Sequence, residues 1–308
     1  MRIIYCSDPL DSNRVDADYK TEYEAARKLG LSAGLISLEH LFADEPEQAI
    51  RKVQSASEAE AAIYRGWMIK PHYYAMLYDA LKSKGITLIN TPEQYRHCHH
   101  FPCSYDIIRE NTPASIWFSE EQVRDNFDSV LEGLQVFGER PVIVKDYVKS
   151  RKHEWEDACY ISDAADKEHA RQVISNFVTR QGDDLNEGIV LREFVRLEFL
   201  NRHPRSDMPL SKEYRVFFLD QQPLMMLHYW DEAEYDEERP NMEHFMDIAR
   251  RVKSRFFTMD IAKLESGDWI IVELGDGQVS GLPDLADIEG FYRSFAHPND
   301  TMLGKEMD

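Results

Sequence analysis

The sequence has few cysteines and no long apolar run. Its 308 residues contain four cysteines, Cys6, Cys98, Cys103 and Cys159, and no two of them form a CxxC pair. This excludes the disulfide framework of small secreted domains, so we expect reduced thiols in a cytoplasmic enzyme. No apolar segment approaches the roughly 20 residues that a membrane-spanning helix needs, and the first segment turns polar too early for a signal peptide. We therefore expect no membrane association.

Basic residues are also scarce. Lys and Arg number 36 against 56 Asp and Glu, which gives a formal net charge of -20. Proteins that coat nucleic acid neutralise phosphates with positive charge, so the composition argues against a nucleic-acid partner, although a local basic groove would be compatible with it. The hydrophobic share of 43% is ample for a packed core. A chain of this length suggests two domains at roughly 150 residues each.

The first 92 residues alternate between strand-like and helix-like segments. One helix has Pro71 at its start and Gly85 just after its end, as helices commonly do. Strands that alternate with helices predict a small parallel sheet. The predicted elements are, in order, residues 1–6 (strand), 18–29 (helix), 33–38 (strand), 71–84 (helix) and 86–90 (strand).

The pattern changes from residue 93 onward, where strands follow one another through turns. The expected hairpins span residues 213–229 and 256–274, and the clearest irregular loop spans 201–211. The remaining predicted elements are strands at 115–118, 141–148 and 188–195 and helices at 120–134, 166–180 and 241–253. We predict an α/β domain at residues 1–92 followed by an α+β module at residues 93–308.

The most informative stretch is FFTMDIAKLESGDWIIVELGDGQVSGLP, residues 256–283. Asp260 and Glu273 lie on the two strands of a hairpin, where their side chains can meet on one face. Facing carboxylates repel each other unless a cation compensates them. Mg²⁺ prefers such oxygen ligands and often bridges nucleotide phosphates. We therefore predict a magnesium site, with Asp276 in the following turn as a further ligand; the alternative is a solvated acidic hairpin.

Three further strands carry weaker signals. Lys145 closes the apolar run of PVIVKDYVKS and could present its charge to a phosphate, although an ordinary surface lysine has the same pattern. The strand GIVLREFV ends in Glu193, Phe194 and Val195, whose backbone and side chains could hold an adenine ring. The alternative for this segment is a plain core strand.

Glu213 and Arg215 lie two residues apart in KEYRVFFLD and so share one face of a strand. The carboxylate could accept hydrogen bonds from ribose hydroxyl groups. The guanidinium could bind a phosphate or an acyl phosphate through two hydrogen bonds. The alternative is a cross-strand salt bridge.

The order of these four segments along the chain resembles the ATP-grasp superfamily of ligases. The segments IIVELGDGQVSGLP and RGWMIKPHYYAML resemble the R2K clade of that superfamily in particular. The resemblance covers nearly the whole chain. It implies a small parallel-sheet, pre-ATP-grasp domain followed by a two-subdomain ATP-grasp module, with ATP bound between the subdomains.

The resemblance also implies a role for each matching residue and a reaction. Lys145 and Arg215 match residues that contact phosphate, and Glu193, Phe194 and Val195 match the adenine hinge. Glu213 matches the ribose carboxylate, and Asp260 and Glu273 match the Mg²⁺ ligands. Enzymes of this kind use ATP and Mg²⁺ to phosphorylate a carboxylate, and an amine then displaces the phosphate. A small molecule or a peptide is the expected substrate.

The sequence departs from the family pattern at two points. Many members carry Asn two residues after the metal-binding Glu, where this chain has Gly275, so Asp276 or Gln278 is expected to take its place. The family's upstream lysine has no counterpart, and Arg96 and Arg109 are the nearest cationic candidates.

Two more segments invite a functional interpretation. Arg65 and Trp67 follow a predicted strand of the first domain, where ligands bind in open α/β sheets, so Arg65 could hold a substrate carboxylate and Trp67 could stack on the substrate. The alternative is a structural arginine at the domain interface. The segment YRHCHHFPC, residues 95–103, contains zinc-binding residue types, but its spacing fits no tetrahedral template.

Two alternative functions remain open. A ligase that joins RNA or other ends by nucleotidyl transfer would need a lysine nucleophile and a basic channel, which the net charge of -20 disfavours. The second alternative is a catalytically inactive nucleotide-binding partner protein, which the absence of the family's upstream lysine would favour.

Overall fold

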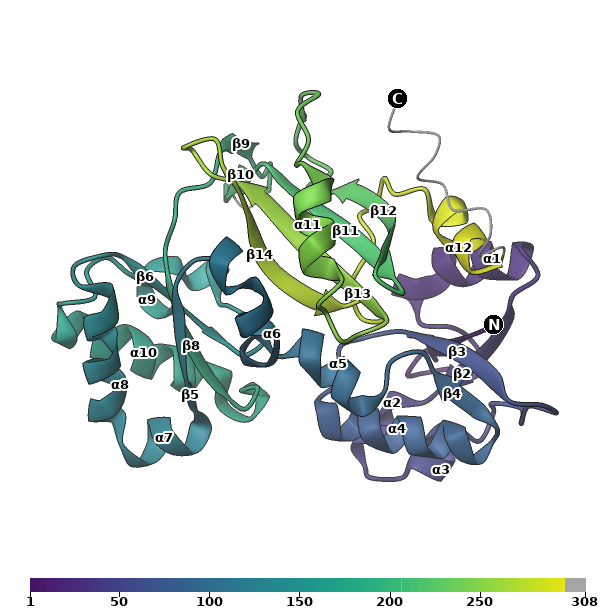
Figure 1. The fold of residues 1–308 in the computed structure, drawn as a ribbon. Coiled ribbons are helices and arrows are strands. Elements are labelled where there is room, and N and C mark those ends of the chain that lie inside the picture. The colour runs from purple at the N-terminus through teal and green to yellow at the C-terminus, as the bar shows by residue number, and fades with distance from the viewer. Residues whose placement is uncertain (206, 297–308) are drawn as a thin grey trace.

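The computed structural model describes residues 1–205 and 207–296. Figure 1 shows a parallel-sheet domain from the first part of the chain, an antiparallel unit from the middle and a second antiparallel sheet from the last part. The predicted combination of a parallel-sheet domain with antiparallel units is therefore confirmed. No helix of the described residues is long and apolar enough to cross a membrane.

The first domain is a four-stranded parallel sheet in the order β2-β1-β3-β4. Side chains of β1 alternate between two cores: Ile4 packs with residues of α4, and Ile3 packs with residues of α1. Both faces are covered, which explains why the middle residues of its strands are mostly apolar. Its elements are β1 (Arg2–Cys6), α1 (Lys20–Lys28), β2 (Ser32–Ile36), α2 (Leu38–Phe42), α3 (Pro46–Ala49), β3 (Glu60–Arg65), α4 (Pro71–Ser83) and β4 (Ile86–Leu88).

The last described helix, α12 (Ile288–Ala296), returns to this first domain. It lies beside α1, as the yellow and purple helices of Figure 1 show. Phe291, Tyr292 and Phe295 are buried there in one cluster with Ile3 and Ile63. The two ends of the described chain are therefore joined by a shared core.

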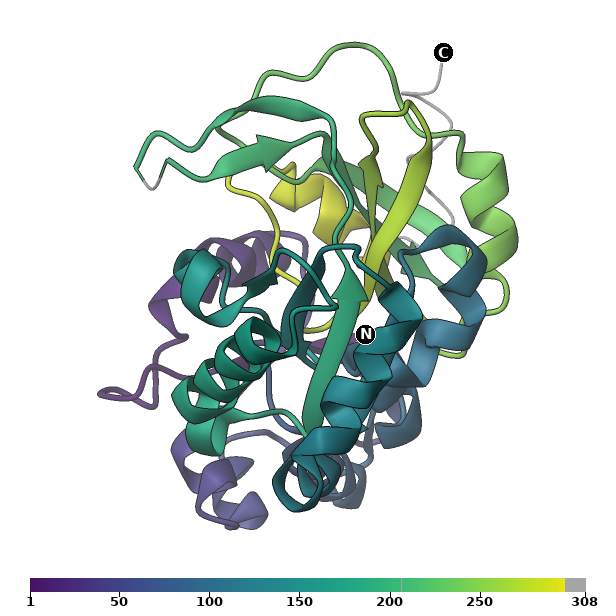
Figure 2. The same cartoon turned by 90° about the vertical axis from the view of Figure 1, so that its left-hand side faces the viewer.

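The middle unit is an antiparallel sheet in the order β5-β8-β6-β7 with helices packed on its outer face (Figure 2). Val144 and Leu191 face those helices, whereas Val190 packs with the C-terminal sheet. Since side chains alternate along a strand, Lys145 and Arg192 face the C-terminal sheet as well. The elements are β5 (Ser115–Ser119), α7 (Glu120–Asp125), α8 (Phe127–Gly133), β6 (Val142–Asp146), α9 (Trp155–Ala158), β7 (Tyr160–Ile161), α10 (Lys167–Gln181) and β8 (Gly188–Glu193).

One predicted helix of this unit is interrupted. The sequence predicts a single helix over 120–134, but Asn126 adopts a non-helical conformation between α7 and α8. Its side chain accepts a hydrogen bond from the Ser129 N–H and caps the second helix. Asparagine is among the preferred residues for this role because it satisfies a free N–H group at a helix start.

The C-terminal sheet is antiparallel in the order β12-β11-β13-β14, and both predicted hairpins are present in it. The predicted loop at 201–211 is wrong in part, because a small separate hairpin forms there; the segment lacks the apolar alternation that would reveal it. The elements are α5 (Pro92–His99), α6 (Phe101–Ile108), β9 (Phe199–Arg202), β10 (Pro209–Ser211), β11 (Glu213–Leu219), β12 (Gln222–His228), α11 (Met242–Ala249), β13 (Phe256–Lys263) and β14 (Trp269–Asp276).

Candidate active site

Three neighbouring strands of the C-terminal sheet carry one row of charged side chains. Arg215 on β11 pairs in register with Asp260 on β13, and Asp260 pairs with Glu273 on β14. Residues directly opposite each other on adjacent strands point to the same face. Glu213 lies two residues before Arg215 and shares that face. The hairpin therefore places its two acids side by side, with a cation and a further acid next to them.

The row is held by two ion pairs. Arg215 donates from Nε and Nη2 to the two carboxylate oxygens of Asp260, at 2.9 and 2.7 Å. The Lys145 Nζ donates to Glu273 Oε2 at 2.7 Å. Lys145 belongs to β6 of the middle unit and Glu273 to the C-terminal sheet, so this second pair spans the two units. The structure thus brings Lys145, Glu213, Arg215, Asp260 and Glu273 together.

The acids of this group differ in their protonation chemistry. Burial raises the pKa of Glu213 to about 7, and the nearby Asp260 and Glu273 charges add to the effect. Burial raises the pKa of Asp260 as well, although Arg215 opposes it. At Glu273, burial is outweighed by Lys145 and other cations, which lower the pKa to about 2.

These residues fit a magnesium ion. Asp260 and Glu273 offer carboxylate oxygens from directly opposite strand positions, and Mg²⁺ is commonly bound through one or two carboxylates together with substrate phosphates. Asp260 is 2% exposed, and its raised pKa reports a carboxylate that burial disfavours in its charged form. A divalent cation would compensate that cost.

Arg192 on β8 is a residue that the sequence analysis missed. Its guanidinium donates to the Val272 carbonyl and, at 2.8 Å, to the Thr112 hydroxyl. Burial lowers its pKa to about 10, and Glu273 is the largest opposing influence. The guanidinium lies 5.3 Å from the centre of the Phe101 ring, and the Lys145 ammonium lies 5.7 Å from the same ring. The signal in the sequence is a charged residue two positions after Val190, near the end of the strand GIVLRE.

The predicted adenine hinge follows β8. Glu193 accepts a hydrogen bond from Arg140 at 2.7 Å. The Phe194 ring packs against Trp155 and Tyr160, with ring centres 5.6 and 5.2 Å away. The segment from Glu193 to Val195 therefore lies at an aromatic cluster of the middle unit, and its adenine role stays a prediction.

The structure does not bring Asp276 to the acids of the charged row. Asp276 lies three residues after Glu273 on β14, so its side chain points to the opposite face. It is fully buried and accepts hydrogen bonds from Asn90 Nδ2 at 2.6 Å and from the Gln278 N–H at 3.0 Å. Gln278 in turn donates to the Tyr74 hydroxyl at 2.8 Å. Both candidates for a third metal ligand thus connect the sheet to the first domain.

Arg65 is also held inside the protein. It is 1% exposed and donates to both carboxylate oxygens of Glu22, each at 2.9 Å. Its Nη1 donates to the carbonyl oxygens of Gly277 and Ser280, each at 2.8 Å. These contacts favour the structural interpretation of Arg65. Trp67 is 46% exposed, and its indole N–H donates to Asp16 at 3.0 Å, so its ring remains open to a substrate.

The two candidates for the missing upstream lysine lie in other pairs. Arg96 contacts Glu187, and Arg109 contacts Asp106, three residues earlier in the chain. Neither takes part in the charged row that the structure describes. Besides Lys145, the charges of Lys152 and Arg192 also lower the pKa of Glu273.

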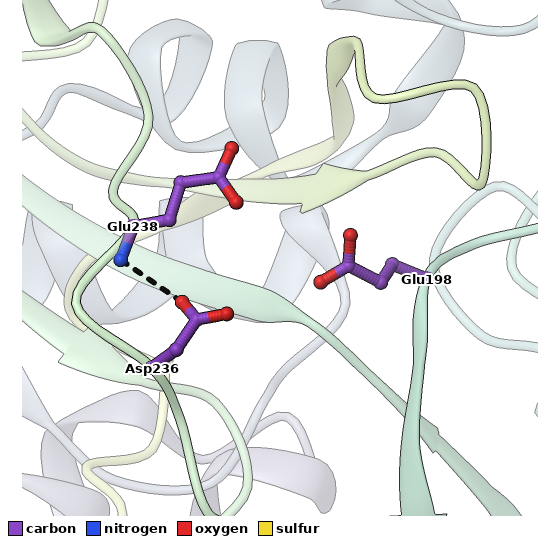
Figure 3. A group of neighbouring side chains, drawn as sticks. All are labelled: Glu198, Asp236 and Glu238. Atoms are coloured by element: carbon purple, nitrogen blue, oxygen red, sulfur yellow. Dashed lines mark hydrogen bonds between the residues drawn. The ribbon is translucent and has the colours of Figure 1, made fainter.

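A second acidic group lies away from this row. Figure 3 shows the carboxylates of Glu198, Asp236 and Glu238 facing one another, with candidate ligand atoms within 4.8 Å. Two lysines already compensate them: Lys212 contacts Asp236 at 2.6 Å, and Lys263 contacts Glu198 at 2.8 Å. The group is therefore a salt-bridge network.

The zinc alternative gains no support from the geometry. Within residues 1–205 and 207–296, the acidic group of Figure 3 is the one set of three or more His, Cys, Asp and Glu side chains close enough to share a metal ion. The segment 95–103 instead supplies buried helix residues such as Cys98 and His99.

Comparison with known proteins decides the family. The profile described as "ATP-grasp domain, R2K clade family 3" matches residues 134–295, which is more than half of the chain. The chain belongs to the R2K clade of the ATP-grasp family. The match confirms the fold class and the class of enzyme expected from the sequence, an ATP-grasp ligase. No curated protein matches the chain in sequence.

Solved structures share this ATP-grasp fold along nearly the whole chain. D-cycloserine synthetase DcsG is 13% identical with a TM-score of 0.59, covering 97% of this chain and 99% of that one. D-alanine–D-alanine ligase from Bacillus anthracis, complexed with ATP, is 16% identical with a TM-score of 0.56, covering 99% and 97%. The ligase PsnB, complexed with a minimal precursor, Mg and ADP, is 12% identical with a TM-score of 0.54, covering 96% and 97%. At these identities the likeness establishes the fold alone.

Proposed function

We propose that this protein is an ATP- and Mg²⁺-dependent ligase that joins a carboxylate to an amine through an acyl phosphate. The observation that carries the proposal is the charged row of Arg215, Asp260 and Glu273, which faces Lys145 across the junction of two sheets. Each of these residues lies on a hydrogen-bonded strand, and the register of β13 with β14 shifts directly after Asp260. The domain division proposed with it is a pre-ATP-grasp domain at residues 1–92 and the ATP-grasp module at 93–308.

We propose a binding role for each residue of the charged row. Asp260 and Glu273 would hold Mg²⁺, which when bound neutralises phosphate charge and aligns the transfer. Lys145 would then leave Glu273 for a phosphate oxygen. Arg215 would hold a phosphate or acyl phosphate through its two parallel N–H groups, the geometry that suits such oxygens. Glu213 would accept hydrogen bonds from ribose hydroxyl groups, and the segment 193–195 would line the adenine site.

The reaction consists of two displacements. A carboxylate oxygen of the first substrate attacks the γ-phosphorus of ATP, and the bond from this phosphorus to the bridging oxygen breaks and releases ADP. The amine nitrogen of the second substrate then attacks the acyl carbon, and phosphate leaves with the electron pair of its C–O bond. The nitrogen loses a proton. Arg215 and Lys145 stabilise the charge that develops on the oxygens.

A small molecule or a peptide is the proposed substrate. Solved neighbours include the macrocyclase MdnC bound with its precursor peptide MdnA and PsnB with its precursor PsnA2. Exposed Trp67 offers a surface on which a substrate could stack. All four cysteines are free thiols, and we propose a cytoplasmic location on that basis.

The test uses hydroxylamine as a general amine. The full chain is incubated with MgATP, hydroxylamine and each member of a panel of carboxylic acids, and nucleotide products and hydroxamates are measured. Acid-dependent ADP, phosphate and hydroxamate are expected. Release of AMP and pyrophosphate would instead indicate nucleotidyl transfer. ATP binding without turnover on any acid or peptide of the panel would favour an inactive binding protein.

A further inference from the structure

A cavity of about 410 Å³ lies between the first domain and the middle unit. Met68, Ile69 and Lys70, from the segment between β3 and α4, line one side of it. Val148 and Lys149, which follow Lys145 in the middle unit, line another. The cavity therefore adjoins the loop that leaves the proposed phosphate-binding lysine.

The charge of the cavity differs from that of the whole protein. Lys70 and Lys149 line it together with one acid, Asp184, although the chain as a whole carries a net charge of -20. The Lys70 ammonium is oriented by the Asp183 carbonyl, to which it donates at 2.7 Å. A carbonyl leaves the lysine its full charge. The lining therefore favours an anionic group.

Part of the cavity lining is apolar. Phe42 and Met68 line it and are 46% and 44% exposed, among the most exposed large apolar side chains of the described residues. The Tyr73 ring packs on Phe42, with ring centres 4.9 Å apart. Binding sites commonly combine such apolar walls with a few placed polar groups. The wall has room for an apolar or aromatic body.

His99 from α5 is a further polar side chain of the cavity. It lines the cavity, is 7% exposed, and its ring stacks on Tyr95 at 4.8 Å. No hydrogen bond among the described residues uses its imidazole, so a ligand could supply the partner. Burial lowers the pKa of His99 to about 3; Lys149 lowers it further, and Glu273 raises it. The imidazole is therefore neutral and offers the cavity one donor and one acceptor nitrogen.

We propose that this cavity binds the carboxylate substrate of the ligase, and that this substrate is a carboxylic acid with an apolar or aromatic body. The inference rests on the proposed function, because it assigns a substrate class to the same reaction. Lys149 and Lys70 attract the carboxylate, His99 donates a hydrogen bond to it, and Phe42 and Met68 contact the apolar body. The carboxylate is thereby held against Val148 and Lys149, in the segment that follows Lys145.

Binding of three probes to the full chain tests the cavity without any turnover. The probes are N-acetyl-phenylalanine, its amide, which lacks the carboxylate, and N-acetyl-glycine, which lacks the ring; affinities are measured by calorimetry. We expect N-acetyl-phenylalanine to bind at least about tenfold tighter than either analogue, the ratio that one lost contact of about 1.4 kcal/mol produces. Equal affinities, or no binding of any probe, would overturn the substrate class.

Variants locate the site. Lys149→Met and Phe42→Ala should each weaken N-acetyl-phenylalanine binding at least about fivefold, which corresponds to about 1 kcal/mol. Lys82→Met, an exposed lysine on α4 outside the cavity, is the matched control and should leave affinity unchanged. Lys149 and Phe42 are exposed, and unchanged melting curves would exclude misfolding. Unaltered binding in both cavity variants would overturn the location.

Turnover separates this inference from the proposed function. If the hydroxylamine assay works and Lys149→Met leaves the KM of the acid unchanged, the cavity assignment fails while the ligase stands. If probes bind and the variants weaken them, but no acid is phosphorylated, the ligase fails while the cavity remains a carboxylate-binding site.

Discussion

Two arginine–carboxylate pairs in this protein have nearly the same local geometry but different surroundings. Arg65 binds Glu22 through two hydrogen bonds of 2.9 Å, and Arg215 binds Asp260 through two of 2.9 and 2.7 Å. Arg65 also donates to backbone carbonyls, and Tyr292 donates to Glu22, so that pair is fully engaged. The difference shows that a bidentate arginine–carboxylate pair does not by itself identify a functional arginine.

The second pair lies among further charges. Arg215 and Asp260 adjoin Glu213 and Glu273, and the Glu273 side chain is 32% exposed. The Arg215 guanidinium lies 4.7 Å from the centre of the Tyr229 ring. Acids that gather on one face, with Asp260 and Glu213 buried and Glu273 partly exposed to solvent, are what a cation and a polyphosphate would reorganise. We therefore interpret the Arg65 pair as structural and the Arg215 pair as part of the active site.

The largest effect is expected from removing the two carboxylates of the charged row. The double variant Asp260→Asn with Glu273→Gln should reduce ADP formation by at least about ten-thousandfold, since metal ions supply several kcal/mol of transition-state stabilisation. The amides keep similar shapes, so the cooperative melting transition should persist. Turnover is measured by ADP release, and full activity in this variant would refute the metal assignment.

The comparison of the two arginines is tested by measuring both stability and turnover in a variant of each. Arg65→Met should lower the free energy of unfolding by about 3–5 kcal/mol, because it leaves Glu22 buried without its cation. Turnover per folded molecule should stay close to that of the original protein. Arg215→Met should do the reverse and reduce turnover far more than stability.

Chemical denaturation and ADP release measure both effects, and Arg250→Met, which removes a surface pair with Asp247, is the control. If Arg65→Met abolished turnover in a protein of unchanged stability, the structural interpretation would be wrong.

Much of this contrast could be predicted from the sequence, but not all of it. Asp260, Glu273, Glu213 and Arg215 are placed by strand alternation and one short hairpin, which are local features. The backbone partners of Arg65 lie at Gly277 and Ser280, more than 200 residues away in the chain, and no local pattern encodes them. Strand alternation places Asp276 on the opposite face of the strand from Glu273, but the glycine-rich sequence around Asp276 predicts a turn instead.

A pH-dependent effect of intermediate size is expected at Asp276. Burial raises its pKa from 3.8 to about 7, so the folded protein keeps a proton that the unfolded chain loses near 3.8. Stability should therefore fall as pH rises from about 4 to 7, by at most about 4 kcal/mol, and the cost is complete above that range. In Asp276→Asn this contribution is absent.

Denaturation curves of both proteins at a series of pH values check this expectation. The quantity to compare is the slope of the unfolding free energy against pH, which should be smaller in the variant. Equal slopes would show that the pKa of Asp276 is the same in the folded and unfolded states.

The smallest effect is expected at the acidic group of Figure 3. Asp236 is exposed, and it shares Lys212 with Glu198 and Glu238. Exposed pairs contribute little to stability because water and salt screen them. Asp236→Asn should lower the melting temperature only slightly and leave turnover unchanged. A large loss of Mg²⁺-dependent activity in this variant would move the metal site to this group.

A crystal structure of the full chain with Mg²⁺ and a non-hydrolysable ATP analogue tests the central claim most directly. We predict Mg²⁺ at about 2.0–2.1 Å from oxygens of Asp260 and Glu273, the distance this ion demands. The Lys145 ammonium should have left Glu273 for a phosphate oxygen. Nucleotide bound elsewhere, or Mg²⁺ bound by Glu198, Asp236 and Glu238 with the Lys145–Glu273 pair intact, would contradict the account.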